Sequence, residues 1–211
     1  MTTEDAVSPR VFYTEHVPAQ WNRTLVEQQA AAAGEPAARR LLDDMRDVDA
    51  TVRIDVAGDD GGTFFLNVRR GAMSAEEAPA GVPLLTVLQD RRAFERIASE
   101  AGDSALGLLG GLSGFTGEFK LTKSRLENLR GISGCLGFEV TGADGFAFRV
   151  QFGGDSPSAE PDTEIRVGPE LYADLRAGRI DPQSAFMNGQ LDVSGDLQIA
   201  MQLALAALSP E

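Results

Sequence analysis

The chain has 211 residues, a length typical of one or two domains, and hydrophobic residues make up 43% of it. This composition excludes a largely disordered chain. The 32 acidic residues outnumber the 19 lysines and arginines, which gives a formal net charge of −13. Because a negative surface repels phosphate backbones and anionic bilayers, we expect no nucleic-acid partner and no stable membrane insertion.

The counts of histidine and cysteine exclude several kinds of chemistry. Cys135 is the single cysteine, so the chain cannot form an internal disulfide or a thiolate metal cage. A catalytic triad would have to rest on the single histidine, His16. We therefore expect no metal, no cofactor and no enzymatic activity, with Cys135 a small buried thiol and His16 an ordinary exposed side chain.

No targeting segment is evident in the sequence. The first ten residues include acidic side chains and lack the apolar region of a secretory signal, and no stretch is long and apolar enough to span a bilayer. The last three residues are Ser209, Pro210 and Glu211, not the peroxisomal Ser-Lys-Leu address. We expect a cytoplasmic protein.

The first half alternates between helical and strand-like patterns. Residues 1–17 read as a flexible N-terminus, and residues 18–131 as a helical segment followed by a sheet-forming unit. The elements expected there are helices at 18–33 and 36–45, a β-hairpin of strands 51–56 and 64–68, a strand at 84–88, a helix at 91–100, a strand at 118–122 and a short helix at 124–129.

The second half, residues 134–208, repeats this order. The elements expected are strands at 137–140 and 146–150, a strand at 164–167, a helix at 169–177, a strand at 190–194 and a last helix at 197–208. The order predicts an internal duplication, and the sequence leaves open whether the two sheets merge. The aligned positions would be Ile54 with Phe138, Val56 with Val140, Gly58 with Gly142, Phe64 with Phe146, Leu66 with Phe148, Val68 with Val150, Gly117 with Gly189, Phe119 with Leu191 and Leu121 with Val193.

The most specific stretch of the chain is residues 175–208. It contains a glycine turn at Gly178, the pair Asp181-Pro182, the run Ala185-Phe186-Met187-Asn188-Gly189, a short strand from Leu191 to Ser194, and Gly195-Asp196-Leu197 at the start of the last helix. These residues, with their spacing, closely resemble the C-terminal part of the sterol carrier protein 2 (SCP2) family. Residues 138–167 fit the family's element order more loosely, and the first half resembles it only through the predicted repeat.

The resemblance implies an α+β fold in which a mainly antiparallel sheet is covered by helices. It also implies an apolar tunnel between the sheet and the C-terminal helix, low selectivity for the lipid head group, and non-enzymatic binding and carriage of fatty acyl chains, fatty acyl-CoA, phospholipids or sterol-like molecules. The residues expected to line that lipid tunnel are Phe138, Phe148, Leu171, Leu175, Phe186, Met187, Leu191, Leu197, Met201 and Leu205.

The last helix is apolar on nearly every side. Only Gln198 and Gln202 are strongly polar over three turns, whereas a surface helix has a polar face about as wide as its apolar one. One side can pack on the sheet, and the other needs a second layer, a protein partner or an apolar ligand. The alternative to lipid carriage is therefore a protein–protein interaction module or homo-oligomer whose tunnel is filled.

Overall fold

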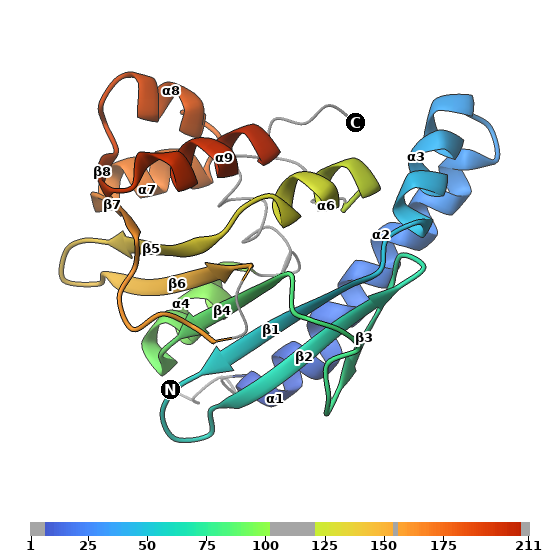
Figure 1. Cartoon of the computed structure of the whole chain (residues 1–211), viewed down its shortest axis with the longest axis horizontal. Helices are drawn as coiled ribbons and strands as arrows, with labels where there is room; N and C mark the ends of the chain where they lie inside the picture. The colour runs from blue at the N-terminus through green and yellow to red at the C-terminus, as the bar shows by residue number, and fades with distance from the viewer. Residues whose placement is uncertain (1–6, 102–120, 154–155, 208–211) are drawn as a thin grey trace, which may run out of the picture.

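The computed structural model describes residues 7–101, 121–153 and 156–207. One eight-stranded sheet runs through it in the order β3-β2-β1-β4-β6-β5-β7-β8 (Figure 1). The strands are β1 (Ala50–Val56), β2 (Gly62–Arg69), β3 (Ala72–Glu76), β4 (Leu85–Gln89), β5 (Gly134–Val140), β6 (Phe146–Phe152), β7 (Thr163–Val167) and β8 (Asp192–Gly195). Their register pairs β1 with β4 and β5 with β7 in parallel, and the other neighbours antiparallel, which confirms the mainly antiparallel α+β class.

The described helices pack against one face of this sheet or against one another. They are α1 (Pro9–Val11), the π-helix η1 (Phe12–His16), α2 (Val17–Ala32), α3 (Pro36–Arg46), α4 (Arg91–Ala101), α6 (Lys123–Arg130), α7 (Pro169–Arg176), α8 (Pro182–Met187) and α9 (Leu197–Ala207). Trp21 of α2, Phe94 of α4 and Ile199 of α9 share one core with Ile54 and Phe148 of the sheet. Along each strand the core residues alternate with residues that point to the helix-free face.

The N-terminal segment is helical from Pro9 onward. The prediction that residues 1–17 form a flexible N-terminus is therefore wrong for residues 9–17. Phe12, Tyr13 and Val17 are buried. The ring of Phe12 lies edge-on to that of Phe94, with 5.5 Å between the ring centroids. Tertiary contacts with distant residues, which local pattern does not reveal, therefore fix this segment.

Two further elements were not predicted from the sequence, and the described end of one expected strand is not in a sheet. β3 lies between the strands expected at 64–68 and 84–88, where no element was predicted. Asn22 of α2 forms two hydrogen bonds with this edge strand: its amide nitrogen donates to the Met73 carbonyl, and its amide oxygen accepts from the Met73 N–H. These bonds hold β3 against α2. The short helix α8 was also missed. Of the strand expected at 118–122, residues 118–120 lie outside the described residues, and Thr122 instead caps α6 by accepting from the Arg125 N–H.

The same order of elements occurs in both halves, in the same register. A constant offset of 84 residues relates α3-β1-β2 to α6-β5-β6, and an offset of 78 relates β4-α4 to β7-α7. In each half the strand after the hairpin pairs in parallel with the first hairpin strand. Corresponding buried residues are Leu42 and Leu126, Met45 and Leu129, Val48 and Ile132, Thr51 and Cys135, Val56 and Val140, Phe64 and Phe148, Leu66 and Val150, and Asn67 and Gln151.

This register corrects one part of the sequence alignment. Phe64 lies opposite Ile54, and Phe148 lies opposite Phe138, so Phe64 corresponds to Phe148 and not to Phe146. The position that corresponds to Phe146 is Gly62. Periodicity could not distinguish these alignments, because a shift of two residues keeps every side chain on the same face. The expected match of Gly117 and Phe119 with residues 189–191 lies outside the described residues, and a duplication in the history of the gene stays a prediction.

The two hairpin turns have the same geometry. The N–H of Gly61 donates to the Gly58 carbonyl and that of Gly145 to the Gly142 carbonyl, each at 3.1 Å. A Cβ atom added to Gly61 would lie 2.1 Å from the Val56 oxygen, and one added to Gly145 would lie 2.3 Å from the Val140 oxygen. Both turns therefore require glycine for the same reason.

We predict that Gly61→Ala and Gly145→Ala lower the free energy of unfolding by similar amounts, about 1–3 kcal/mol each, because either methyl group collides with a backbone carbonyl. Gly81→Ala is the matched control, since a Cβ there meets nothing within 4 Å. Urea denaturation followed by circular dichroism measures all three. A cost at one turn and none at the other would contradict the shared geometry.

A buried polar pair lies under the first half of the sheet. Gln89 of β4 donates its side-chain N–H to the hydroxyl oxygen of Tyr13. Burial raises the pKa of Tyr13 to about 12, although the hydrogen bond from Gln89 opposes this rise. The neutral phenol is therefore the form that the folded core holds.

This pKa predicts a loss of stability at alkaline pH. An unfolded tyrosine loses its proton near pH 10, whereas folded Tyr13 keeps its proton up to about pH 12. The free energy of unfolding should therefore fall as the pH rises from about 10 towards 12. Urea denaturation at pH 9 and pH 11 should show a larger fall for the wild type than for Tyr13→Phe. Equal falls would place the Tyr13 hydroxyl in contact with water.

Candidate functional site

Aromatic rings gather on the helix-covered face of the second half. Phe138 of β5 lies beside Phe148 of β6, with 5.3 Å between their ring centroids. Tyr172 of α7 approaches Phe146 edge-on at 5.6 Å and Phe138 at 6.5 Å. The strands supply three rings and the helix that follows β7 supplies the fourth, so these contacts join sheet and helix into one apolar wall.

The corresponding place in the first half has a different composition. Ile54 stands where the second half has Phe138, Gly62 stands where it has Phe146, and Phe94 of α4 corresponds to Tyr172. The strands of the first half thus supply two rings fewer. Phe12 and Tyr13 of η1 bring two rings instead, and the Tyr13 ring lies 5.5 Å from that of Phe64.

Burial differs between the two halves accordingly. On α4, Ala93, Phe94 and Ile97 are at most 1% exposed. The corresponding residues of α7, which are Leu171, Tyr172 and Leu175, are all only half-buried. The N-terminal helices cover this apolar face in the first half, and among the described residues no equivalent segment covers it in the second.

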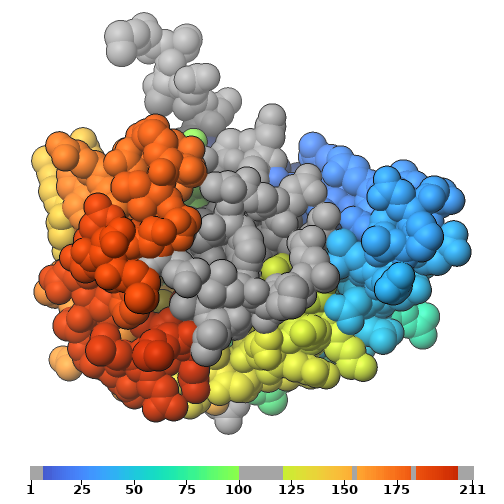
Figure 2. Space-filling view, turned by 90° about the horizontal axis from the view of Figure 1, so that it is seen from above, coloured from blue at the N-terminus to red at the C-terminus, as the bar shows by residue number. Residues whose placement is uncertain are grey.

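Helices α8 and α9 expose large apolar side chains at this end of the molecule. Met187 is 75% exposed, Met201 55%, Leu197 48% and Phe186 38%. Two buried residues, Ala185 and Ile199, hold these helices to the protein. In Figure 2 the orange and red atoms of α7 to α9 form one end of the surface, opposite the blue end formed by α2 and α3.

The structure divides the expected lining residues into two groups. The inner group lies in or against the main core: Phe148 is buried, and Phe138, Leu171 and Leu191 are partly buried. Leu175 is half-buried. The exposed group on α8 and α9 is Phe186, Met187, Leu197 and Met201. The side chain of Leu205 lies outside the described residues. A tunnel lined by these residues therefore stays a prediction.

Sequence reasoning missed two members of the aromatic wall, although signals for both were present. Phe146 alternates with Phe148 along β6, so the two rings point to the same face. Tyr172 precedes Leu175 by three residues on α7, which places both on one side of that helix. These spacings would have added both rings to the set.

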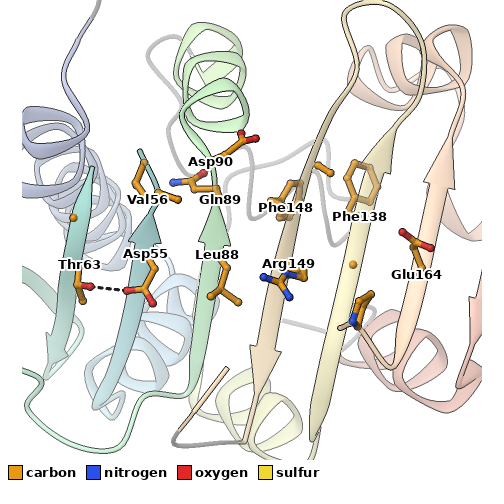
Figure 3. A pocket seen from close by; sticks show the side chains of 15 residues that line it. Asp55, Val56, Thr63, Leu88, Gln89, Asp90, Phe138, Phe148, Arg149 and Glu164 are labelled. Carbon is orange, nitrogen blue, oxygen red and sulfur yellow. Dashed lines mark hydrogen bonds between the residues drawn. The ribbon is translucent and has the colours of Figure 1, made fainter. Parts of the chain in front are cut away.

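A hollow of about 570 Å³, lined in part by Phe138 and Phe148, lies across the sheet where the halves meet (Figure 3). Asp55, Leu88, Arg149 and Glu164 line it and alternate with core residues such as Val56 and Phe148. Thr63 donates to Asp55 at 2.8 Å, and Arg149 donates to the Ser158 carbonyl at 3.0 Å. Because charged groups that already have partners line it, this hollow suits an apolar chain less well than the aromatic wall does.

The described residues contain no cluster of three or more His, Cys, Asp or Glu that could hold a metal ion. Cys135 is buried, as predicted, and burial raises the pKa of its thiol, which disfavours the reactive thiolate. His16 is exposed, also as predicted. Within residues 7–101, 121–153 and 156–207, no helix is long and apolar enough to cross a membrane.

These features define an α+β protein that carries a partly exposed apolar wall between a sheet and its C-terminal helices. Residues 116–207 match the model of the SCP-2 sterol transfer family. The family resemblance predicted from residues 175–208 is thus confirmed for the second half of the chain. No curated protein matched the chain.

Several solved structures are similar at low identity. The crystal structure of sterol carrier protein 2 like 2 from Aedes aegypti is 23% identical, with a TM-score of 0.29, over 36% of this chain and 75% of that one. A solution structure of the palmitated form of that protein is 21% identical, with a TM-score of 0.31, over 36% and 74% of the two chains. Apo sterol carrier protein 2 from Yarrowia lipolytica is 20% identical, with a TM-score of 0.29, over 42% and 79%.

The two sides of α9 should respond differently to substitution. We predict that Leu197→Gln changes the free energy of unfolding by less than about 0.5 kcal/mol, because this side chain is already 48% exposed. Ile199→Ala should cost about 2–5 kcal/mol, because Ile199 packs in the core. Urea denaturation of both variants checks this. A large cost at Leu197 would mean that another part of the protein covers it.

Proposed function

We propose that this protein binds and carries lipids that contain a fatty acyl or sterol-like part, without catalysing a reaction on them. The apolar part would lie along Phe138, Leu171 and Tyr172, with Leu197 and Met201 closing over it. Fatty acids, fatty acyl-CoA and phospholipids all supply such a chain. The wall itself is apolar, and the guanidinium of Arg176 lies beside it, 6.0 Å from the centroid of the Tyr172 ring.

The observation that carries this proposal is the difference in burial between the two halves. Phe94 and its neighbours on α4 are fully buried because Phe12 and Tyr13 cover them. Tyr172 and its neighbours on α7 occupy the corresponding positions and are half-buried. An apolar chain that covers α7 would do there what η1 does in the first half.

Burial of the chain can supply most of the binding free energy. Each buried methylene contributes about 0.8 kcal/mol, so ten buried methylenes contribute about 8 kcal/mol before the cost of ordering the chain. Met187 and Met201 suit ligands of varied shape, because an unbranched thioether adapts its conformation at low cost. The net charge of −13 opposes docking on anionic membranes, which favours delivery through water over transfer during membrane contact.

A protein partner is the second candidate occupant. The four exposed side chains of α8 and α9 could equally dock on a partner or on another copy of this chain. That function would leave the aromatic wall closed by its own ring contacts. The two functions predict different co-purifying molecules: a protein partner in this case, and a lipid in the case of lipid carriage.

The glutamate variant Met201→Glu tests lipid carriage. A carboxylate at this exposed position should weaken binding of a fluorescent fatty acid at least tenfold, because the charge would have to leave water when the chain is buried. The melting temperature should change little, since Met201 is 55% exposed. Val26→Glu is the control, because Val26 on α2 is also an exposed apolar residue, at 61%.

Native mass spectrometry of the purified protein, with an organic extract of the same sample, gives the direct readout. Lipid at about one molecule per chain supports the proposal and identifies the natural ligand. A protein that is free of lipid and also takes up no added fatty acid would overturn it and leave the protein partner as the function to pursue.

A further inference from the structure

We propose that the first half holds a second acyl-chain site, which the protein closes with its own residues Phe12 and Tyr13. This inference rests on the proposed function, because it takes the aromatic wall of the second half as the lipid site. It assigns to η1 the place that an acyl chain takes in the second half. The intact protein then carries one lipid per chain.

The match in size between the two halves supports this assignment. The strand positions of Phe138 and Phe146 are held in the first half by Ile54 and Gly62, which leaves room for two rings. Phe64 takes part of this room, since a Cβ atom added to Gly62 would lie 3.5 Å from its ring, and Tyr13 packs on Phe64 with 5.5 Å between the ring centroids. Phe12 and Tyr13 also contact Phe94, at ring distances of 5.5 Å and 5.9 Å. A fold that repeats its strands in register would otherwise have an apolar hollow here.

A hydrogen bond between Gln89 and Tyr13 shows that η1 is fitted to the core of the first half. Gln89 lies in the core of the first half at the position where the second half has Val167, and a buried amide needs a hydrogen-bond partner. Tyr13 supplies this partner through its hydroxyl group. Tyr13 thus pairs with the amide nitrogen of Gln89, whereas the amide oxygen of Gln89 is buried without a hydrogen-bond partner among the described residues. Val167, at the corresponding position, has no side-chain polar group to pair.

The π-helical geometry of η1 also fits Phe12 and Tyr13 to this place. η1 is a π-helix of five residues between two α-helical segments, and a π-turn holds one more residue per turn than an α-turn. Phe12 and Tyr13 are adjacent in sequence, yet both are buried against the sheet and α4. Thr14 and the exposed Glu15 and His16 complete the turn towards solvent. The segment therefore presents both rings to the core.

The test counts bound palmitate by native mass spectrometry on delipidated full-length protein. The wild type should bind one palmitate per chain, and the double variant Phe12→Ala/Tyr13→Ala should bind two. Phe152→Ala is the control, because it removes a buried ring of the same sheet face at the far end of β6 and should bind one. If the double variant does not fold, Phe12→Ala alone provides the same count.

Two results would overturn the inference. One is a folded variant that binds no palmitate beyond the wild-type count. The other is a second palmitate that also appears in Phe152→Ala, which would show that any ring-sized cavity takes up the probe. Trp21, the single tryptophan, is buried in the first half, so quenching of its emission by a polyene fatty acid should appear only in the opened variant.

Adding Met201→Glu separates this inference from the proposed function. In that background the double variant should bind one palmitate, whereas the single Met201→Glu variant should bind palmitate at least tenfold more weakly than the wild type. A wild type that binds none, together with a double variant that binds one, would refute lipid carriage by the second half and retain the site in the first.

Discussion

The antiparallel pairing of β4 with β6 is the contact on which the rest of the structure depends. Five residue pairs, from Leu85 opposite Phe152 to Gln89 opposite Phe148, join the two halves into one sheet. The hairpins therefore share one helix-covered face and a single core. Without this pairing, each half would expose a sheet edge and a separate apolar face.

Two corresponding apolar faces follow from this arrangement, and they are covered in different ways. In the first half, η1 and α2 lie over the sheet, and the rings of Phe12 and Tyr13 pack on Phe94, which is buried. In the second half, α7 stays half-buried and α8 and α9 expose four large apolar side chains. A stable core and a partly open apolar surface thus coexist in one small protein, which is the combination that carriage of an apolar ligand needs.

Much of this could be predicted from the sequence because the patterns are local. Alternation gave the hairpin strands, and glycine and proline marked the turns. The run from Gly178 to Leu197 identified the family that the second half matches. β3 was missed because its sequence, Ala-Met-Ser-Ala-Glu, has no β-branched residue, and it forms only through pairing with β2 and through Asn22. The candidate site was predicted in part: its wall was expected, but Phe146 and Tyr172 were not.

The sequence by itself determined the α+β class, the order of the elements and the apolar character of the last helix, since each depends on the spacing of neighbouring residues. Only the tertiary structure decided that the sheets merge, that Phe64 corresponds to Phe148, and that Phe12 and Tyr13 enter the first half. These outcomes depend on contacts between residues as far apart as Tyr13 and Gln89. Periodicity cannot encode them, because a shift of two residues preserves the face of a strand but changes every partner across it.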